Sequence, residues 1–315
     1  MKTILGLLAV FALAISTAAA QETLRYNYEP GQRFAVVFKQ ELKTATQLDE
    51  RPIETQMETS LETTWLVESV DAEGRATLRQ TIDRIQMKLT APAFGTLQYD
   101  SAQVESEAPA TAEPEAGEPE EGADAKADLS AKTLAEAVAP LVGAEMIRVI
   151  DGRGQVVSAK LSEEAQRALA ASSGRRLNEL LSEAGLAQLF RQVDVILPEG
   201  EVKAGEEWSD KTTIRSPFGP IGMTFRYRLL EAEEEGIARF AAQVECDYSE
   251  VGRELGISMR VKEQTSEGSV EFVREAGRLA SLARSQKLTL ESTAGDQSTQ
   301  QTLETKMELT VTPKP

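Results

Sequence analysis

Apolar and polar side chains alternate along most of this chain with a period of two residues. Phe34, Val36 and Phe38 occupy every second position of one run, and Phe225 and Tyr227 lie between polar residues in another. Successive side chains of a β-strand point to opposite faces, so this alternation predicts strands with one buried face. Similar runs cover residues 61–67, 76–82, 238–248, 255–261, 270–273, 279–290 and 303–311. The chain is therefore predicted to form mostly antiparallel β-structure.

One run changes parity in its middle. Leu78 and Ile82 share one parity, whereas Ile85 belongs to the other. A long strand accommodates such a change through a β-bulge, which inserts one residue and bends the sheet. We therefore predict a bulge near Asp83 and Arg84, and with it a curved sheet.

Glycine-containing turns join these runs at residues 71–74, 151–154 and 234–236, as hairpins require. Asp71 and Glu73 supply only a fragment of a calcium-binding loop, which needs further oxygen ligands and a closing glutamate. Gly152 and Gly154 begin a G-x-G pattern, but they lie in a tight hairpin and not between a strand and a helix. Neither turn predicts a ligand site.

Helical spacing appears in two places. Residues 161–192 begin a helix at Ser162, break at Gly174 and continue with one apolar face, which predicts two or three short helices packed on the sheet. Residues 131–138 form a second, weaker helical stretch. Between the strands and these helices, residues 102–128 combine Pro, Gly, Ala and Glu with few apolar side chains. This composition predicts a disordered acidic insertion.

The two halves of the chain share landmarks in the same order. Gly31 and Gly205 each precede a strand that begins with an aromatic residue, and the later turns at Gly74 and Gly236 also correspond. We therefore predict a mainly β (α+β) fold made of duplicated antiparallel curved sheets or of a half-barrel. The predicted parts are a first β-unit (21–101 and 129–160), a helical connection (161–198) and a second β-unit (199–315).

The first twenty residues have the three zones of an export signal. Lys2 supplies the positive end, residues 4–15 form an apolar run, and small residues end at Ala20. We predict cleavage between Ala20 and Gln21 and a periplasmic or secreted protein. The apolar run is shorter than the roughly 20 residues that span a bilayer, so no integral membrane segment is predicted after removal of the signal. The cleavage region also lacks the cysteine of a lipoprotein.

Composition excludes several mechanisms. The chain has no histidine and one cysteine, Cys246, so histidine-dependent triads, two-histidine zinc sites and intramolecular disulfides are impossible. Cys246 falls on an apolar strand face, where a small buried hydrophobe is expected. The formal net charge is −17, which argues against nucleic acid as a partner. No cofactor or metal is predicted.

Individual residues offer no catalytic signature. Trp65 and Trp208 could stack on a sugar, but both lie within alternating runs, where an indole usually packs in the core. Arg226 and Arg228 could hold an anion, and an exposed strand face explains them equally well. No Asp or Glu is marked by a motif, so no catalytic residue is predicted.

Several motifs resemble one known family. They are L-R-Y-N-Y-E-P-G-Q from Leu24, W-L-V-E-S-V-D-A-E-G-R-A from Trp65, T-I-D-R-I-Q-M from Thr81, the Y-D-S at Tyr99, the L-V-G at Leu141 and V-K-A-G-E-E-W ending at Trp208. Together they resemble a bacterial family of exported proteins that is catalogued only as a domain of unknown function. The resemblance implies neither an activity nor site residues.

Three classes of function remain open. The first is an exported envelope protein with a non-catalytic binding or scaffold role, whose partner is an unknown protein or an apolar ligand. Its more specific form is a carrier that holds a lipid or another apolar ligand in a half-barrel. The second class is a structural or interaction protein, whose duplicated sheets provide a scaffold and whose acidic insertion engages a partner. The third class is a hydrolase that uses carboxylates alone.

Overall fold

The computed structural model describes residues 21–48, 51–103, 131–171, 191–216, 219–231 and 236–315. The predicted signal, nearly all of the acidic insertion and residues 172–190 of the predicted helical connection lie outside the described residues.

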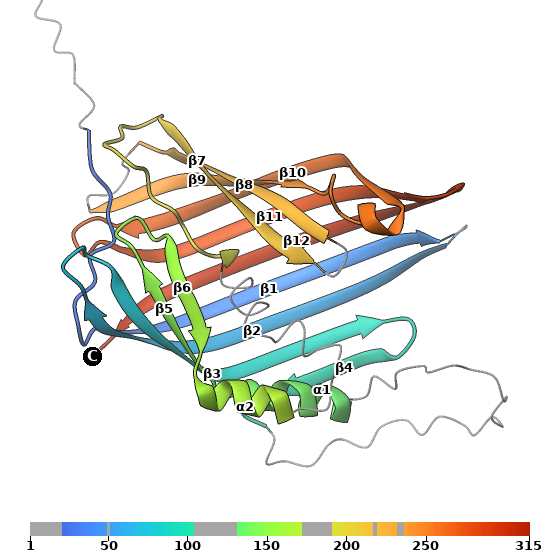
Figure 1. Ribbon diagram of the computed structural model, residues 1–315, viewed down its shortest axis with the longest axis horizontal. Helices are drawn as coiled ribbons and strands as arrows, with labels where there is room; N and C mark the ends of the chain where they lie inside the picture. Colours follow the sequence, from blue (N-terminus) through green and yellow to red (C-terminus); the bar gives the residue numbers. More distant parts are fainter. Residues whose placement is uncertain (1–20, 49–50, 104–130, 172–190, 217–218, 232–235) are drawn as a thin grey trace, which may run out of the picture.

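One open antiparallel sheet of twelve strands makes up the fold (Figure 1). Across the sheet the order is β6-β5-β3-β2-β1-β12-β11-β10-β9-β8-β7, and β4 pairs with β3. The half-barrel alternative is confirmed, because strands of both predicted β-units belong to this curved sheet. The strands are β1 (Arg33–Leu48), β2 (Arg51–Val70), β3 (Ala76–Ala91), β4 (Gly95–Asp100), β5 (Glu145–Ile150), β6 (Val156–Leu161), β7 (Glu207–Ser216), β8 (Gly219–Leu229), β9 (Ile237–Asp247), β10 (Ile257–Val273), β11 (Arg278–Ala294) and β12 (Gln297–Lys314).

Short helices lie beside one end of the strand order. They are α1 (Ala131–Val138), the 3-10 turn η1 (Ala139–Leu141) and α2 (Glu163–Ala171), while a second 3-10 turn, η2 (Arg253–Leu255), precedes β10. The predicted helix start at Ser162 is confirmed, since α2 begins at Glu163 and Ser162 Oγ accepts a hydrogen bond from Ala165 N–H at 3.2 Å. In Figure 1, α1 and α2 lie near β4 and the end of β6.

The predicted bulge is confirmed in β3. Glu62 faces Arg84 and the next residue of β2, Thr63, faces Ile82, so Asp83 is the inserted residue. Thr64 Oγ1 donates a hydrogen bond of 2.6 Å to the Asp83 carboxylate. The insertion explains why the buried residues of β3 change parity, and it bends the sheet there.

Two irregular segments fill the concave side at one end of the sheet. Residues 21–32 reach the turns of both halves: Tyr26 N–H donates to Gly152 O, and Asn27 N–H donates to Gly277 O, each at 2.8 Å. Residues 191–202 cross beside them, and Glu22 forms a β-bridge with Val202. A Cβ at Gly277 would lie 2.5 Å from Asn27 Cβ, so glycine is required where the first segment docks.

The start of each predicted unit has the same geometry. Gly31 N–H donates to Val67 O, and Gly205 N–H donates to Leu229 O, both at 2.8 Å. Both glycines have positive φ, 89° and 86°. These matched contacts support the proposal that the sheet arose by duplication of one unit.

Candidate functional site

The concave face of the sheet is packed at one end and partly open further along the same strands. Phe34 and Phe38 on β1 are buried in the core, whereas Leu42, on the same face of β1, is only half-buried. A row of directly opposed residues crosses six strands at the level of Leu42, and we call this row the trough. Its members are Gln286, Thr305, Leu42, Met57, Leu89 and Leu97.

Four neighbouring members of the trough are apolar, from Leu42 on β1 to Leu97 on β4. All six members are half-buried, although they continue the face that carries the core. Removing apolar side chains from water is favourable by roughly 25 cal/mol for each Å² of apolar surface that is buried. The trough is therefore suited to contact an apolar molecule.

Buried charges lie next to the packed end. Arg148 on β5 is 3% exposed and pairs with Asp194 at 2.5 Å. Burial raises the pKa of the Asp194 carboxyl, and the nearby Arg148 opposes that rise. Arg284 on β11 donates to Gln192 O at 2.8 Å and lies over the Phe225 ring, 5.1 Å from its centroid. These arginines attach the crossing segment 191–202 to the sheet.

β9 and β10 separate from each other part-way along. They pair only over residues 237–241 and 269–273, while β10 continues to Ile257 paired with β11. Beyond the paired residues, the backbone of β9 forms its hydrogen bonds with side chains of β10 and not with the backbone of β10. Gln264 Oε1 accepts from Cys246 N–H at 3.1 Å, Gln264 Nε2 donates to Val244 O at 2.9 Å, and Ser266 Oγ accepts from Val244 N–H at 3.0 Å.

This separation opens a cavity of about 650 Å³, which we call the slot. Its walls come from β7, β8, β9, the loop after β9 and the first residues of β10. Residues with the parity of the core line its inner part: Met223, Cys246, Tyr248, Met259 and Val261. Residues of the opposite parity line its outer part: Lys211, Arg226, Glu245, Asp247 and Arg260. The lining of the slot therefore combines apolar residues of the inner face with charged residues of the outer face.

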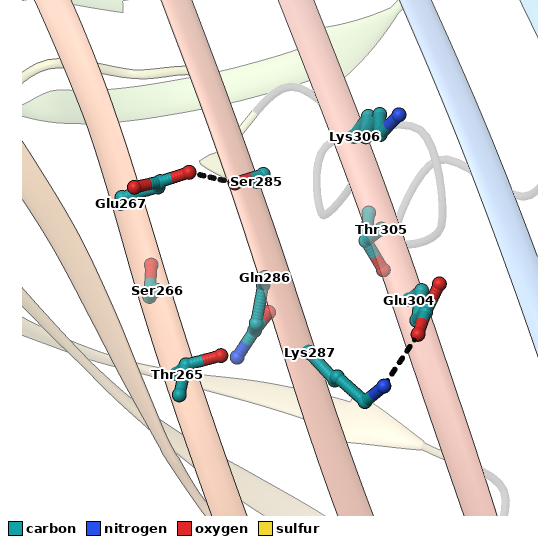
Figure 2. A pocket seen from close by; sticks show the side chains of 9 residues that line it. All are labelled: Thr265, Ser266, Glu267, Ser285, Gln286, Lys287, Glu304, Thr305 and Lys306. Atoms are coloured by element: carbon teal, nitrogen blue, oxygen red, sulfur yellow. Dashed lines mark hydrogen bonds and ion pairs between the residues drawn. The ribbon is translucent and has the colours of Figure 1, made fainter.

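A second, smaller hollow of about 330 Å³ lies over β10, β11 and β12 (Figure 2). Cross-strand pairs build it: Lys287 Nζ lies 2.7 Å from Glu304, and Ser285 Oγ donates to Glu267 at 3.4 Å. The Lys287–Glu304 pair is about half exposed, where an ion pair contributes little. The charged side chains that line this hollow, on Glu267, Lys287, Glu304 and Lys306, belong to the face opposite to the trough, while Gln286 and Thr305 of the trough also line it.

The residues discussed from sequence have mostly structural roles. Trp208 packs face to face on Tyr227 and donates from Nε1 to Ile196 O at 2.8 Å, while Trp65 is 7% exposed within the core. Cys246 is buried as predicted, and burial raises the pKa of its thiol. Arg226 pairs with Glu245 at 2.7 Å on the exposed face.

The sequence interpretation missed the slot. Gln264 and Ser266 lie in an alternating polar run that reads as an ordinary solvated strand face. Their hydrogen bonds to β9 depend on residues about twenty positions away, so no local pattern indicates them. Within the described part of the chain, no three Cys, Asp or Glu side chains converge as they would around a metal ion. None of the helices described there has the length and apolar character needed to cross a membrane.

Comparisons with solved structures find matches of low sequence identity and with TM-scores below 0.5. No family model and no curated protein sequence matches the chain. A structure on lipid–protein interactions in lipovitellin has a TM-score of 0.46 at 10% identity, and the match covers 90% of this chain and 25% of that one. The translocator domain of the autotransporter NalP from Neisseria meningitidis has a TM-score of 0.28 at 7% identity, with 90% and 89% covered.

A DUF1329 family protein from Desulfovibrio piger has a TM-score of 0.14 at 7% identity, with 86% and 83% covered. The chain thus spans a quarter of the lipovitellin chain and most of the other two. At these levels the family resemblance drawn from the sequence motifs stays a prediction.

Proposed function

We propose that this protein is a non-catalytic carrier that holds an apolar chain in the trough of its half-barrel. The observation that carries the proposal is the half-buried apolar row from Leu42 to Leu97 on the face that also carries the core. The sequence supports an exported carrier, because residues 1–20 have the zones of a signal peptide.

The dimensions of the trough fit a single alkyl chain. Leu42 and Leu97 are separated by three strand spacings, which is about 14 Å at roughly 4.8 Å per spacing. One leaflet of a bilayer core, half of about 30 Å, gives a similar length for an ordered acyl chain, about 15 Å. An alkyl chain lying across the strands would therefore cover the apolar row from Leu42 to Leu97.

Replacing an apolar residue of the trough should weaken binding. We expect Met57→Gln to lower the affinity for hexadecanol about tenfold, because a buried methionine contributes roughly 1.5–3 kcal/mol and about 1.4 kcal/mol corresponds to a factor of ten. Leu42→Gln should act similarly. The measurement is equilibrium binding of radiolabelled hexadecanol to the folded protein.

Lys43→Gln is the matched control, since Lys43 follows Leu42 in β1 and points to the opposite face. It should leave the affinity unchanged. Equal affinity in all three variants and the original protein would show that the alkyl chain does not lie in the trough.

A further inference from the structure

We infer that the ligand of the trough is a neutral single-chain amphiphile whose uncharged hydroxyl head is bound by Gln40 and Thr59. This inference rests on the proposed function and adds the chemical class of the ligand. Gln40 on β1 and Thr59 on β2 face each other directly, in the register that also pairs Leu42 with Met57. The two polar residues therefore form a row of the inner face that adjoins the trough on the side of the packed core.

The spacing along the strands lets one molecule contact both rows. Gln40 precedes Leu42 by two residues, and Thr59 follows Met57 by two residues. Two residues span about 7 Å at roughly 3.4 Å per residue, and side chains two apart in a strand are neighbours on one face. All four side chains are half-buried, so a ligand reaches them from the concave side. A head group on Gln40 and Thr59 is thus continuous with an alkyl chain on Leu42 and Met57.

Gln40 and Thr59 have hydrogen-bonding groups that are not in use. Neither side chain makes a hydrogen bond with any residue that the structure describes. Further along the same face, by contrast, Gln301 Nε2 donates to Thr46 Oγ1 at 3.3 Å. The Gln40 amide and the Thr59 hydroxyl each offer a donor and an acceptor. A ligand hydroxyl also donates and accepts, so it is complementary to this pair.

The inner face around the trough is uncharged over the described residues 40–46, 53–59, 87–91, 95–99 and 299–307. Every charged side chain of these stretches has the parity of the outer face: Glu41, Lys43, Glu54, Glu58, Lys88, Glu304 and Lys306. An ionised head group on the inner face would lose part of its hydration without gaining a counter-ion, which is unfavourable. The trough therefore favours a neutral head group over a carboxylate.

Arg284 on β11 is a charged side chain of the inner face, but it points away from the trough. It faces Met307 on β12, which in turn faces Gln40. Its guanidinium lies over the ring of Phe225 on β8 and donates to Gln192 O, and β8 lies on the side of β11 away from β1. Arg284 is only 7% exposed. It therefore supplies no counter-ion for a head group at Gln40.

The test compares hexadecanol, hexadecane and palmitate by equilibrium binding of the radiolabelled compounds. We expect palmitate to bind about tenfold more weakly than hexadecanol at about pH 8, where its carboxyl group is ionised. Gln40→Leu should lower the affinity for hexadecanol about fivefold, the net value of one hydrogen bond, and leave the affinity for hexadecane unchanged. Thr59→Val, which keeps the shape of the side chain, should act in the same way.

A second pair of variants adds the missing cation. Thr59→Lys should raise the affinity for palmitate about fivefold, the upper end for one partly exposed ion pair, without raising the affinity for hexadecanol. Ser60→Lys is the matched control, since Ser60 follows Thr59 in β2 and points to the opposite face. It should alter neither affinity.

The outcomes separate the inference from the function on which it rests. If Met57→Gln weakens hexadecanol and hexadecane but palmitate binds as tightly as hexadecanol, the trough stands and the neutral class of ligand is wrong. If neither Gln40→Leu nor Thr59→Val selectively weakens hexadecanol, the head group does not lie on this pair and the inference is also wrong. If Met57→Gln changes the affinity for neither compound, the carrier function itself is wrong.

Discussion

Arg148→Met should lower the free energy of unfolding by about 3–5 kcal/mol, because it leaves the Asp194 carboxylate in the interior without its partner arginine. A buried ion that loses its counter-ion keeps the full cost of its removal from water. Urea denaturation followed by tryptophan fluorescence measures the loss, since Trp208 contacts the segment that Asp194 belongs to.

Arg226→Met is the matched control. It breaks the Arg226–Glu245 pair, whose side chains are 55% and 56% exposed, and it should cost less than about 1 kcal/mol. The double variant Arg148→Met/Asp194→Leu should recover most of the stability, because no charge is then left unpaired. A loss for Arg148→Met no larger than that for Arg226→Met would show that the interior pair is not desolvated.

Phe272→Ala should be comparably damaging, with a loss of about 3–5 kcal/mol. Phe272 is 0% exposed, meets the edge of the Tyr26 ring at a centroid distance of 5.4 Å and lies 6.5 Å from Phe240. Removing its ring leaves a cavity between the N-terminal segment and the sheet. The same denaturation measurement, combined with limited proteolysis of residues 21–32, should show lower stability and faster cleavage of that segment.

Phe272→Leu separates the loss of volume from the loss of ring contacts. Leucine fills most of the space, so the cost should fall to about 1.5 kcal/mol or less. If leucine and alanine were equally destabilising, aromatic contact with Tyr26 and not cavity formation would dominate.

Local sequence patterns predicted the local features of this fold. The change of parity between Ile82 and Ile85 placed the bulge, and Ser162 placed the start of a helix, because each signal depends on neighbouring residues alone. Residues 194–198, which follow the predicted helical stretch 161–192, have no regular secondary structure. Leu197 is fully buried there, and a buried apolar run does not reveal by itself whether it forms a helix or an extended segment.

The features that define the candidate site depend on contacts between distant residues. The trough exists because β1 pairs with β12, which joins the two predicted units into one sheet. Hairpin patterns indicate which strands that follow each other in sequence form pairs. They do not indicate which strand of the first unit pairs with which strand of the second. The slot depends on Gln264 reaching the backbone of Val244, twenty residues earlier.

The docking of the N-terminal segment has a consequence for when this protein can finish folding. Glu22 accepts a hydrogen bond from Arg274, which lies 252 residues later in the sequence. β1 pairs with β2 along one edge and with β12 along the other. The N-terminal segment and β1 therefore reach their final positions only after Arg274 and β12 have been synthesised, and such distant pairings are slow to form.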